Sequence, residues 1–519
     1  MEVIGKLDYY ERQLKTPLFN ALVNYARKKK ISFHTPGHKH GDGIPKKFRD
    51  FVGARIFDMD LTLLEEVDSL QDPKTVIKEA QKLAAEAYGS DYSFFLVNGT
   101  TIGNHAMILS VCLPGDKIII PRNAHKSVIA GVILSGAIPI YVYPKIDKEL
   151  GIICNVTPQD IEKKILEHPD VKAILITNPT YNGITTDIRE IVRIAHQYKK
   201  ILLVDEAHGP HLKFHPDLPT SAMEGGADIC VQSTHKIISG MTQASMLHAR
   251  KTVDILKLKR ILQLLHTTSP SYILLASLDV ARMQMATQGR EILSRVISLA
   301  EESRKHLNNL GIRCFGKEVI GKEGIFGLDV TKLTIDTRNL GNTGYEVSKL
   351  LNKKYGIQVE FATPSNLLAI VSLGNTKNDM YRLIHSLKDI KKNFKINENI
   401  AKALSNIAIP EFKSDVVLTP REAAFSITKK VPFKDAIGLI SAEVISPYPP
   451  GIPLLIPGER ITKEVYDYLN LLKELGNIIN GQDDKRLQTI KVVCETRHEI
   501  NGFIQSTFEF DKIINFKHN

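Results

Sequence analysis

The stretch "KAILITNPTYNGITTDIREIVRIAHQYKKILLVDEAHG" (172–209) contains the pattern that decides the fold. Two short apolar runs, "AILIT" and "ILLV", flank a segment at 187–198 that has a helical pattern. Continuous apolar runs bounded by turns are typical of strands buried on both faces, and such strands alternate with helices in parallel sheets. The stretch therefore predicts a strand–helix–strand unit.

The same alternation extends in both directions from this unit. Further strands are expected at "KIIIP" (117–121), "IPIYVYP" (138–144) and "DICVQS" (228–233), with helices at 123–135 and 158–167. Before them, "KTVIKEAQKLAAEAY" (74–88) places its apolar residues on one helical face, and Gly89 is a typical helix stop. We expect a helical arm over 1–30 and then an α/β large domain over 31–310 with a mostly parallel sheet.

The pattern changes near residue 311. Antiparallel strands are expected at "IRCFGKE" (312–318), "FGLDVTKLTID" (326–336) and "GIQVEFAT" (356–363), with helices at 344–353 and 377–392. These elements predict a small α+β domain over 311–400. After a charged helix ending near 407, a C-terminal α+β domain is expected over 401–519. Its stretch "ISPYPPGIPLLIPGERI" (445–461) is too rich in proline for regular structure.

Composition excludes several classes of protein. The 519 residues include 68 Lys and Arg against 57 Asp and Glu, a net charge of +11, but the lysines are spread along the chain and tryptophan is absent. We therefore expect no nucleic-acid partner. No apolar run approaches the ~20 residues of a membrane span, and the charged N-terminus does not resemble a signal peptide. The five scattered cysteines, none in a CxxC pair, indicate reduced thiols in a cytoplasmic protein without a zinc site.

The first candidate site residues follow the apolar run at 94–97. In "NGTT" (98–101) a strand is expected to lead into a helix at Gly99, Thr100 and Thr101. Free backbone N–H groups at a helix start, with hydroxyls and a glycine, can hold a phosphate. The stretch is neither a Walker loop nor GxGxxG, and an ordinary helix cap would have the same composition.

Two further candidates lie at the ends of later strands. Asp205 follows "ILLV", where an ionised carboxylate needs a partner. His208 stands three residues on and could indicate a metal ligand, but no other carboxylate or cysteine clusters with it in the sequence. Lys236, in "QSTHK" (232–236), follows the strand "DICVQS". Burial would disfavour its charge and suit Schiff-base chemistry, although a single lysine after a strand is commonly a surface residue.

Together these parts predict a pyridoxal phosphate (PLP) site. The helix start would bind the phosphate, Asp205 would pair with the pyridinium nitrogen, and Lys236 would hold the aldehyde as an imine. His125, in "PRNAHKS" (121–127), could stack on the flat ring or cap a helix. No metal is expected.

The sequence closely resembles the bacterial ornithine/lysine/arginine decarboxylase family, PLP enzymes of the aspartate-aminotransferase-like fold (fold type I). It looks like the short form, without the N-terminal wing domain, and is most similar to biosynthetic arginine decarboxylases. The resemblance spans almost the whole chain and rests on "HTPGHKHG" (34–41), "NGTTIGN" (98–104), "PRNAHKS", "NPTYNG" (178–183), "DEAHGPHLKFHPDLPTSAMEGGAD" (205–228), "QSTHK", "HTTSPSY" (266–272), "TPREAAF" (419–425) and "YPPGIPLLIPGE" (448–459).

The resemblance implies a role for each matching position. Lys236 would be the Schiff-base lysine and Asp205 the pyridinium partner, while Ala207 and His125 would pack on opposite faces of the ring. Thr267 would reach a phosphate in a neighbouring subunit, which implies a homodimer or higher oligomer with shared sites. The remaining expected cofactor contacts are Gly99, Thr100, Thr101, His208, Ser233 and His235.

The implied reaction is α-decarboxylation of a basic amino acid, most simply L-arginine to agmatine and CO₂ in polyamine biosynthesis. Lysine and ornithine are alternative substrates. A PLP aminotransferase and an inactive regulatory homologue are the rival interpretations. A cationic substrate tail needs carboxylates, and the candidates are Glu422, Glu443, Glu459, Asp58, Asp60, Glu65 and Asp68.

Overall fold

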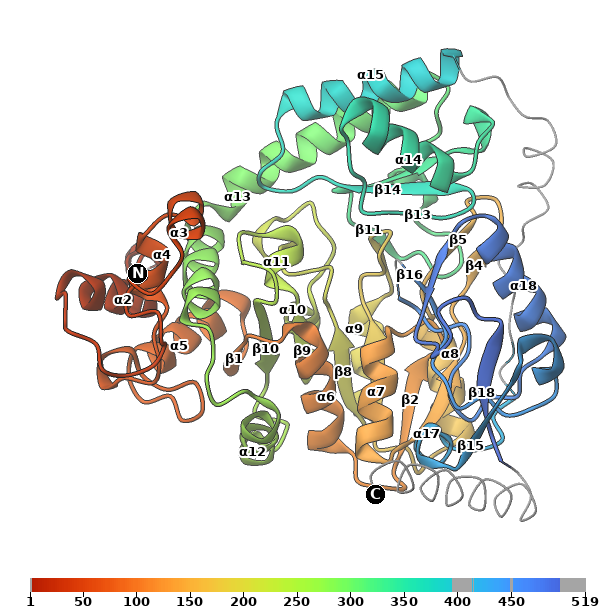
Figure 1. The fold of residues 1–519 in the computed structure, drawn as a ribbon, viewed down its shortest axis with the longest axis horizontal. Helices are drawn as coiled ribbons and strands as arrows, with labels where there is room; N and C mark the ends of the chain where they lie inside the picture. Colours follow the sequence, from red (N-terminus) through yellow and green to blue (C-terminus); the bar gives the residue numbers. More distant parts are fainter. Residues whose placement is uncertain (1, 394–412, 414, 449–450, 495–519) are drawn as a thin grey trace, which may run out of the picture.

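The chain forms a large α/β body with two further lobes, seen in a computed structural model that describes residues 2–393, 413, 415–448 and 451–494 (Figure 1). The body contains a seven-stranded sheet in the order β1-β10-β9-β8-β6-β2-β3. Its strands are β1 (Tyr92–Leu96), β2 (Lys117–Pro121), β3 (Ile138–Val142), β6 (Ala173–Thr177), β8 (Ile201–Asp205), β9 (Ile229–Gln232) and β10 (Ser245–Ala249).

The sheet is mostly parallel, as predicted. Strands β3, β2, β6, β8 and β9 run in one direction, and β10 is antiparallel to both of its neighbours, β9 and β1. The five strands expected between 117 and 233 are confirmed. Strand β10 carries "SMLHA", which the sequence reading did not single out.

Both faces of the sheet are buried, which explains why its strands read as continuous apolar runs. Ile118 and Ile120 face one core with α6 (Gly99–Val111), α7 (Lys126–Ser135) and α12 (Ile255–Leu265). Ile119, between them in β2, faces the other core with α8 (Pro158–Glu167), α9 (Ile188–Gln197) and α10 (Ala222–Gly225). The predicted helices at 123–135, 158–167 and 187–198 correspond to α7, α8 and α9.

The N-terminal helices pack at one end of the body, at the left of Figure 1. They are α1 (Glu2–Gln13), α2 (Pro17–Arg27), α3 (Lys46–Val52), α4 (Arg55–Met59) and α5 (Val76–Tyr88). The predicted stop at Gly89 is confirmed, because Gly89 ends α5 in the left-handed conformation with φ 73°. Buried Asp279, in α13 (Tyr272–Asn309), accepts hydrogen bonds from the N–H groups of Leu18 and Phe19 and so caps the start of α2.

Helix α13 leads from the body into the upper lobe of Figure 1. That lobe has a three-stranded antiparallel sheet, β12 (Lys332–Asp336), β14 (Asn366–Ile370) and β13 (Phe361–Ala362), with α14 (Gly344–Tyr355) and α15 (Lys377–Asn393). The two helices agree with the prediction. The strand expected at 312–318 is wrong: Cys314 forms only an isolated bridge to Ile335, and a 3-10 turn, η3 (Lys317–Val319), follows.

The C-terminal lobe packs on the body beside α7 and the end of β2. It contains α17 (Pro420–Phe425), β15 (Thr428–Pro432), β16 (Ser446–Tyr448), α18 (Lys463–Glu474), β17 (Ile478–Asn480) and β18 (Thr489–Val493). The prediction that 445–461 has no regular structure is wrong at 446–448, which form β16 paired with β17. Residues 451–461 are irregular apart from single bridges. The charged helix expected to end near 407 lies outside the described residues.

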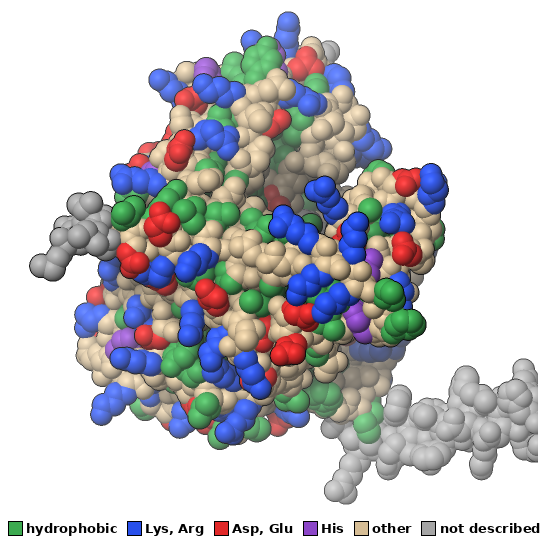
Figure 2. Space-filling model, turned by 90° about the vertical axis from the view of Figure 1, so that its left-hand side faces the viewer, with side chains coloured by type: hydrophobic (Ala, Val, Ile, Leu, Met, Phe, Trp, Pro, Cys, Tyr) green, Lys and Arg blue, Asp and Glu red, His purple; other side chains and the backbone are tan. Residues whose placement is uncertain are grey.

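Other features of the molecule bear on its chemistry. All five cysteines are buried and none forms a disulfide. Among the described helices, none has the length and apolar character needed to cross a membrane. The described residues contain no group of three or more His, Cys, Asp or Glu side chains placed to hold a metal ion. On the face drawn in Figure 2, basic and acidic side chains are interspersed.

Candidate active site

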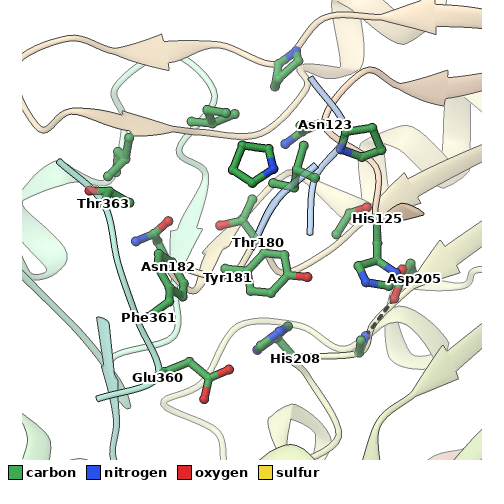
Figure 3. A pocket seen from close by; sticks show the side chains of 18 of the residues that line it. Asn123, His125, Thr180, Tyr181, Asn182, Asp205, His208, Glu360, Phe361 and Thr363 are labelled. Carbon is green, nitrogen blue, oxygen red and sulfur yellow. Dashed lines mark hydrogen bonds between the residues drawn. The ribbon is translucent and has the colours of Figure 1, made fainter. Parts of the chain in front are cut away.

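A cavity of about 1020 Å³ opens at the carboxyl ends of the parallel strands. Residues after β2, β6, β8 and β9 line it, together with residues 360–366 of the upper lobe and 452–454 of the C-terminal lobe. This is the edge at which open α/β sheets bind their ligands. Figure 3 shows His125 beside Asp205, with Tyr181, His208 and Glu360 farther along the same cavity.

The start of α6 forms one end of the cavity. Asn98 is its N-cap residue but makes no capping hydrogen bond through its side chain, and the first turn holds no acidic residue. Gly99 has φ 68° and open space where a Cβ would stand. The Thr100 hydroxyl lies 2.6 Å from Ser233 Oγ and 3.3 Å from Ser245 Oγ. Free N–H groups and clustered hydroxyls at a helix N-terminus suit a phosphate.

Asp205 is the last residue of β8 and only 2% exposed. Its carboxylate accepts hydrogen bonds from Asn104 Nδ2 at 2.9 Å and from the Ala207 N–H at 3.2 Å. Both donors are uncharged. A buried carboxylate held by neutral donors suits a cationic ligand nitrogen, because an unpaired buried charge is costly.

Lys236 lies in α11 (Thr234–Ile237), directly after β9. Its Nζ is 2.9 Å from His208 Nε2 and 5.4 Å from the centre of the Tyr181 ring. Burial lowers the pKa of Lys236, while the charges of Asp205 and Glu360 act in the opposite direction. The ammonium form is therefore disfavoured, which is the property a nucleophilic lysine needs.

His125 is the N-cap of α7, where its Nδ1 accepts a hydrogen bond from the Ser127 N–H. Burial lowers its pKa to about 4, against the opposing charge of Asp205. The ring is therefore a neutral imidazole at pH 7. Its position in the cavity beside Asp205 allows it to lie against a flat ligand that Asp205 binds.

The structure brings most of the expected cofactor residues into one cavity. Thr101, Ala207 and His235 line it, and His235 Nδ1 is 3.0 Å from the Ala244 carbonyl. Thr267 is exposed and outside the cavity, with its hydroxyl 3.3 Å from Ser269 Oγ. Its predicted role in a neighbouring subunit stays a prediction.

None of the seven carboxylates considered for the substrate tail lines this cavity. Asp68 accepts backbone hydrogen bonds at the start of α5, and Glu422 belongs to the capping box of α17. Glu443 is buried and accepts the N–H groups of Asp483 and Lys491. Asp58 and Asp60 lie beside histidines of the 34–41 loop, and Glu65 belongs to the turn η1 (Glu65–Val67).

Glu459 instead fixes the C-terminal lobe against the body. Arg122, directly after β2, donates Nε at 3.0 Å and Nη2 at 2.8 Å to its carboxylate. The same guanidinium donates to the carbonyls of Pro453 and Leu454, and both partners are more than nine-tenths buried. This pair holds the irregular stretch that forms one wall of the cavity.

Sequence reasoning missed several polar residues of the cavity. Asn104 binds Asp205, but it lies inside a helix where its type gives no signal. Ser245 contacts the Thr100 hydroxyl without lining the cavity itself, and it belongs to β10, which was not predicted. Glu360 reaches the cavity from the loop before β13 in the upper lobe (Figure 3), and only the placement of that lobe reveals it.

The residues present fit pyridoxal phosphate. The start of α6 and its hydroxyls can bind a phosphate, and buried Asp205 can pair with a pyridinium nitrogen. The amine of Lys236 can react with the aldehyde. All three line one cavity. The seven-stranded sheet with its single antiparallel strand and this set of groups define a large domain of the aspartate-aminotransferase-like class, fold type I, as predicted.

The chain belongs to the Orn/Lys/Arg decarboxylase family. Residues 16–379 match the family's major domain and residues 403–500 match its C-terminal domain. An arginine decarboxylase of Bacillus subtilis is 42% identical over 93% of this chain and 99% of its own length. One of Bacillus anthracis is 42% identical over 94% and 99%. The predicted family and enzyme class, an amino-acid decarboxylase, are confirmed.

Solved structures show the same architecture. The lysine decarboxylase of Francisella novicida is similar, with a TM-score of 0.79 and 26% identity over 93% of this chain and 82% of that chain. Lysine decarboxylase A of Pseudomonas aeruginosa has a TM-score of 0.80 and 25% identity over 93% and 81%.

Proposed function

We propose that this enzyme uses pyridoxal phosphate to decarboxylate L-arginine, giving agmatine and CO₂. The observation that carries the proposal is the placement of Lys236, Asp205 and the uncapped start of α6 around one cavity. The family restricts the substrate to ornithine, lysine or arginine. Arginine is favoured because four relatives that are 41–43% identical carry the name arginine decarboxylase.

Different residues of the chain would bind different parts of the cofactor. Pyridoxal phosphate, when bound, supplies an electron-withdrawing ring that would accept the electron pair left on Cα when CO₂ departs. Thr100, Ser233 and the N–H groups of α6 hold its phosphate. Lys236 provides the amine for its attachment, and Asp205 holds the positive charge of the ring nitrogen. His125, a neutral imidazole, packs on the ring beside Asp205.

We propose that Glu360 binds the cationic tail of the substrate. It lines the cavity and lies near enough to Lys236 for its charge to influence that lysine. Glu323 also lines the cavity, but its carboxylate already pairs with Lys145 at 2.9 Å. Glu360 is itself an exposed residue of this chain. A carboxylate can accept a planar guanidinium through two parallel hydrogen bonds, whereas an ammonium makes a point contact.

We further propose a cytoplasmic homodimer with shared active sites. Large apolar side chains are exposed on the N-terminal loops and on α12, including Ile31 at 87%, Phe33 at 94% and Leu264 at 77%. Exposed apolar groups of this size are typical of protein interfaces. Leu264 precedes Thr267 by three residues, so contact here would bring Thr267 to the partner.

Cofactor attachment is tested by adding pyridoxal phosphate to the full chain and to the variant Lys236→Ala. We expect an absorbance band from lysine-bound cofactor in the wild type and none in the variant. Amine and CO₂ formation identifies a decarboxylase, whereas keto-acid formation would identify an aminotransferase. Full turnover by Lys236→Ala would contradict the assignment of this lysine.

The role of Glu360 is tested with Glu360→Gln, and Glu323→Gln serves as the control at the same cavity. Loss of a charge-assisted contact should raise KM for arginine by about tenfold or more. The control should change KM by less than about twofold, because the Glu323 carboxylate is already paired with Lys145. Equal KM values in the two variants would rule out Glu360 as the tail partner.

A further inference from the structure

Lys236, the proposed nucleophile, and a histidine that follows the neighbouring strand form a part-buried pair. His208, three residues after β8, is 3% exposed, and its Nε2 lies 2.9 Å from Lys236 Nζ. The Tyr181 ring packs against the imidazole with 4.5 Å between centroids. Residues after three neighbouring strands, β6, β8 and β9, therefore fix the position of Nζ.

Charged groups surround this pair from several elements. Lys332 of β12 and Asp329 before it are fully buried and joined at 2.8 Å. His125 faces the pair from the start of α7, Asp205 from the end of β8 and Glu360 from the loop before β13.

Burial is the largest influence on the pair and lowers the pKa of both His208 and Lys236. The charge of Lys332 lowers both pKa values further. An uncharged imidazole beside an uncharged amine is the favoured state.

The other ring nitrogen decides which partner donates the shared hydrogen. His208 Nδ1 is buried and has no hydrogen-bond partner within the described residues. If Nε2 accepted a hydrogen from an ammonium, the proton of the neutral ring would lie on Nδ1 as a buried, unpaired N–H. If Nε2–H donates, Nδ1 is an unpaired acceptor instead. Buried N–H groups without a partner are the rarer and more costly case.

We propose that His208 is a positioning residue for Lys236: its Nε2–H donates a hydrogen bond to the lone pair of Nζ and holds the lysine as an uncharged, reactive amine. This inference rests on the proposed role of Lys236 in attaching the cofactor. It adds a second residue that controls how readily attachment takes place.

Two matched variants test the proposal. In His208→Gln the side-chain amide nitrogen can occupy the place of Nε2 and donate to Nζ. In His208→Asn the shorter side chain reaches only the place of Nδ1. Both remove the imidazole and keep a polar amide, so they differ in whether a donor reaches Lys236.

The measurement is the pH dependence of Lys236 labelling by an amine-selective acylating reagent. It is carried out on the full chain freed of cofactor, from about pH 6 to about pH 11, with mass-spectrometric quantification. Lys46, whose side chain is 90% exposed, is the internal reference. We expect the labelling midpoint of Lys236 to rise by on the order of one pH unit in His208→Asn, a tenfold change, and to return toward wild type in His208→Gln.

A midpoint that falls in His208→Asn would show that the imidazole accepts from an ammonium, and an unchanged midpoint would show that the contact has no effect. Equal shifts in both variants would assign the effect to packing. Each of these results overturns the inference.

The labelling needs neither cofactor nor turnover, so its outcome is independent of the proposed function. The proposed function fails separately if the wild type binds no pyridoxal phosphate or releases no CO₂ from arginine.

Discussion

Single residues set the chemistry of this enzyme through their burial. Asp205 ends β8 and Lys236 follows the neighbouring strand β9, so the sheet brings together two groups that are 31 positions apart in the sequence. Their types and their positions after apolar runs could be predicted. The contacts that hold them could not, because Asn104 and His208 reach them only when helix α6 and the loop after β8 are placed in space.

Replacing Asp205 with Asn should remove the charge and keep the side-chain volume. We expect pyridoxal phosphate still to bind but kcat to fall by at least about a hundredfold, since a preorganised charge at the reacting group is lost. Absorbance and kcat measured on the same preparation test this. Retention of kcat within about twofold would remove Asp205 from the mechanism.

His248 should make stability depend on acid pH. Its ring is fully buried against Tyr88, and burial lowers its pKa to about 3. The unfolded chain takes up a proton near pH 6.5, whereas the folded chain does not, so its contribution to stability is present above pH 6.5 and is lost as the pH falls toward 3. From pH 7 to pH 5 the loss should be about 2 kcal/mol.

Denaturant unfolding of the wild type and of His248→Gln at both pH values checks this. At pH 7 the variant should be less stable than the wild type, because it has fewer packing contacts. The variant lacks the titrating group, so the difference between the two free energies of unfolding should be about 2 kcal/mol smaller at pH 5 than at pH 7. A gap that stays constant would show that His248 does not titrate in this range.

At the scale of elements, the parallel core was predicted more fully than the antiparallel parts. Strands β12 and β13 lie inside the stretches expected at 326–336 and 356–363, but β10 and β14 were not predicted. Strands β2, β6 and β8 are apolar on both faces and stand out as continuous runs. Strand β10 contains a serine and a histidine that are satisfied only by their neighbours, Ser93 and Gln232 among them. Strand β14, "NLLAI", is as long as these strands, but it begins with an asparagine directly after a bend and was not recognised from its pattern.

The contact between Arg122 and Glu459 should be essential for the docking of the C-terminal lobe. Glu459→Ala leaves a buried guanidinium without its counter-charge, which should cost about 3–5 kcal/mol in the free energy of unfolding. Asp467→Asn breaks the exposed pair with Lys463 and is the control, expected to cost about 1 kcal/mol or less. Similar losses in the two variants would mean that the buried pair does not anchor this lobe.

At the scale of the whole molecule, a second copy of the chain is expected to complete each site. Thr267→Glu would place a carboxylate against the partner's phosphate and should abolish activity by charge repulsion. Lys236→Ala should be inactive for a different reason. A mixed dimer of the two variants regenerates one site with both an intact Lys236 and an intact Thr267.

Mixing the two inactive variants under subunit exchange should therefore restore activity, up to about half of the wild type per mixed dimer. Sedimentation of each variant alone controls for loss of assembly. If both variants assemble and no activity returns, Thr267 does not serve the partner's site.

The most direct test of the central claim is product analysis with arginine, lysine and ornithine supplied together at equal concentration. Mass spectrometry of the wild type with pyridoxal phosphate should find agmatine as the main product, with one CO₂ released for each agmatine, and Lys236→Ala should give none. A keto acid, an amine from lysine or ornithine as the main product, or agmatine from Lys236→Ala would contradict the account.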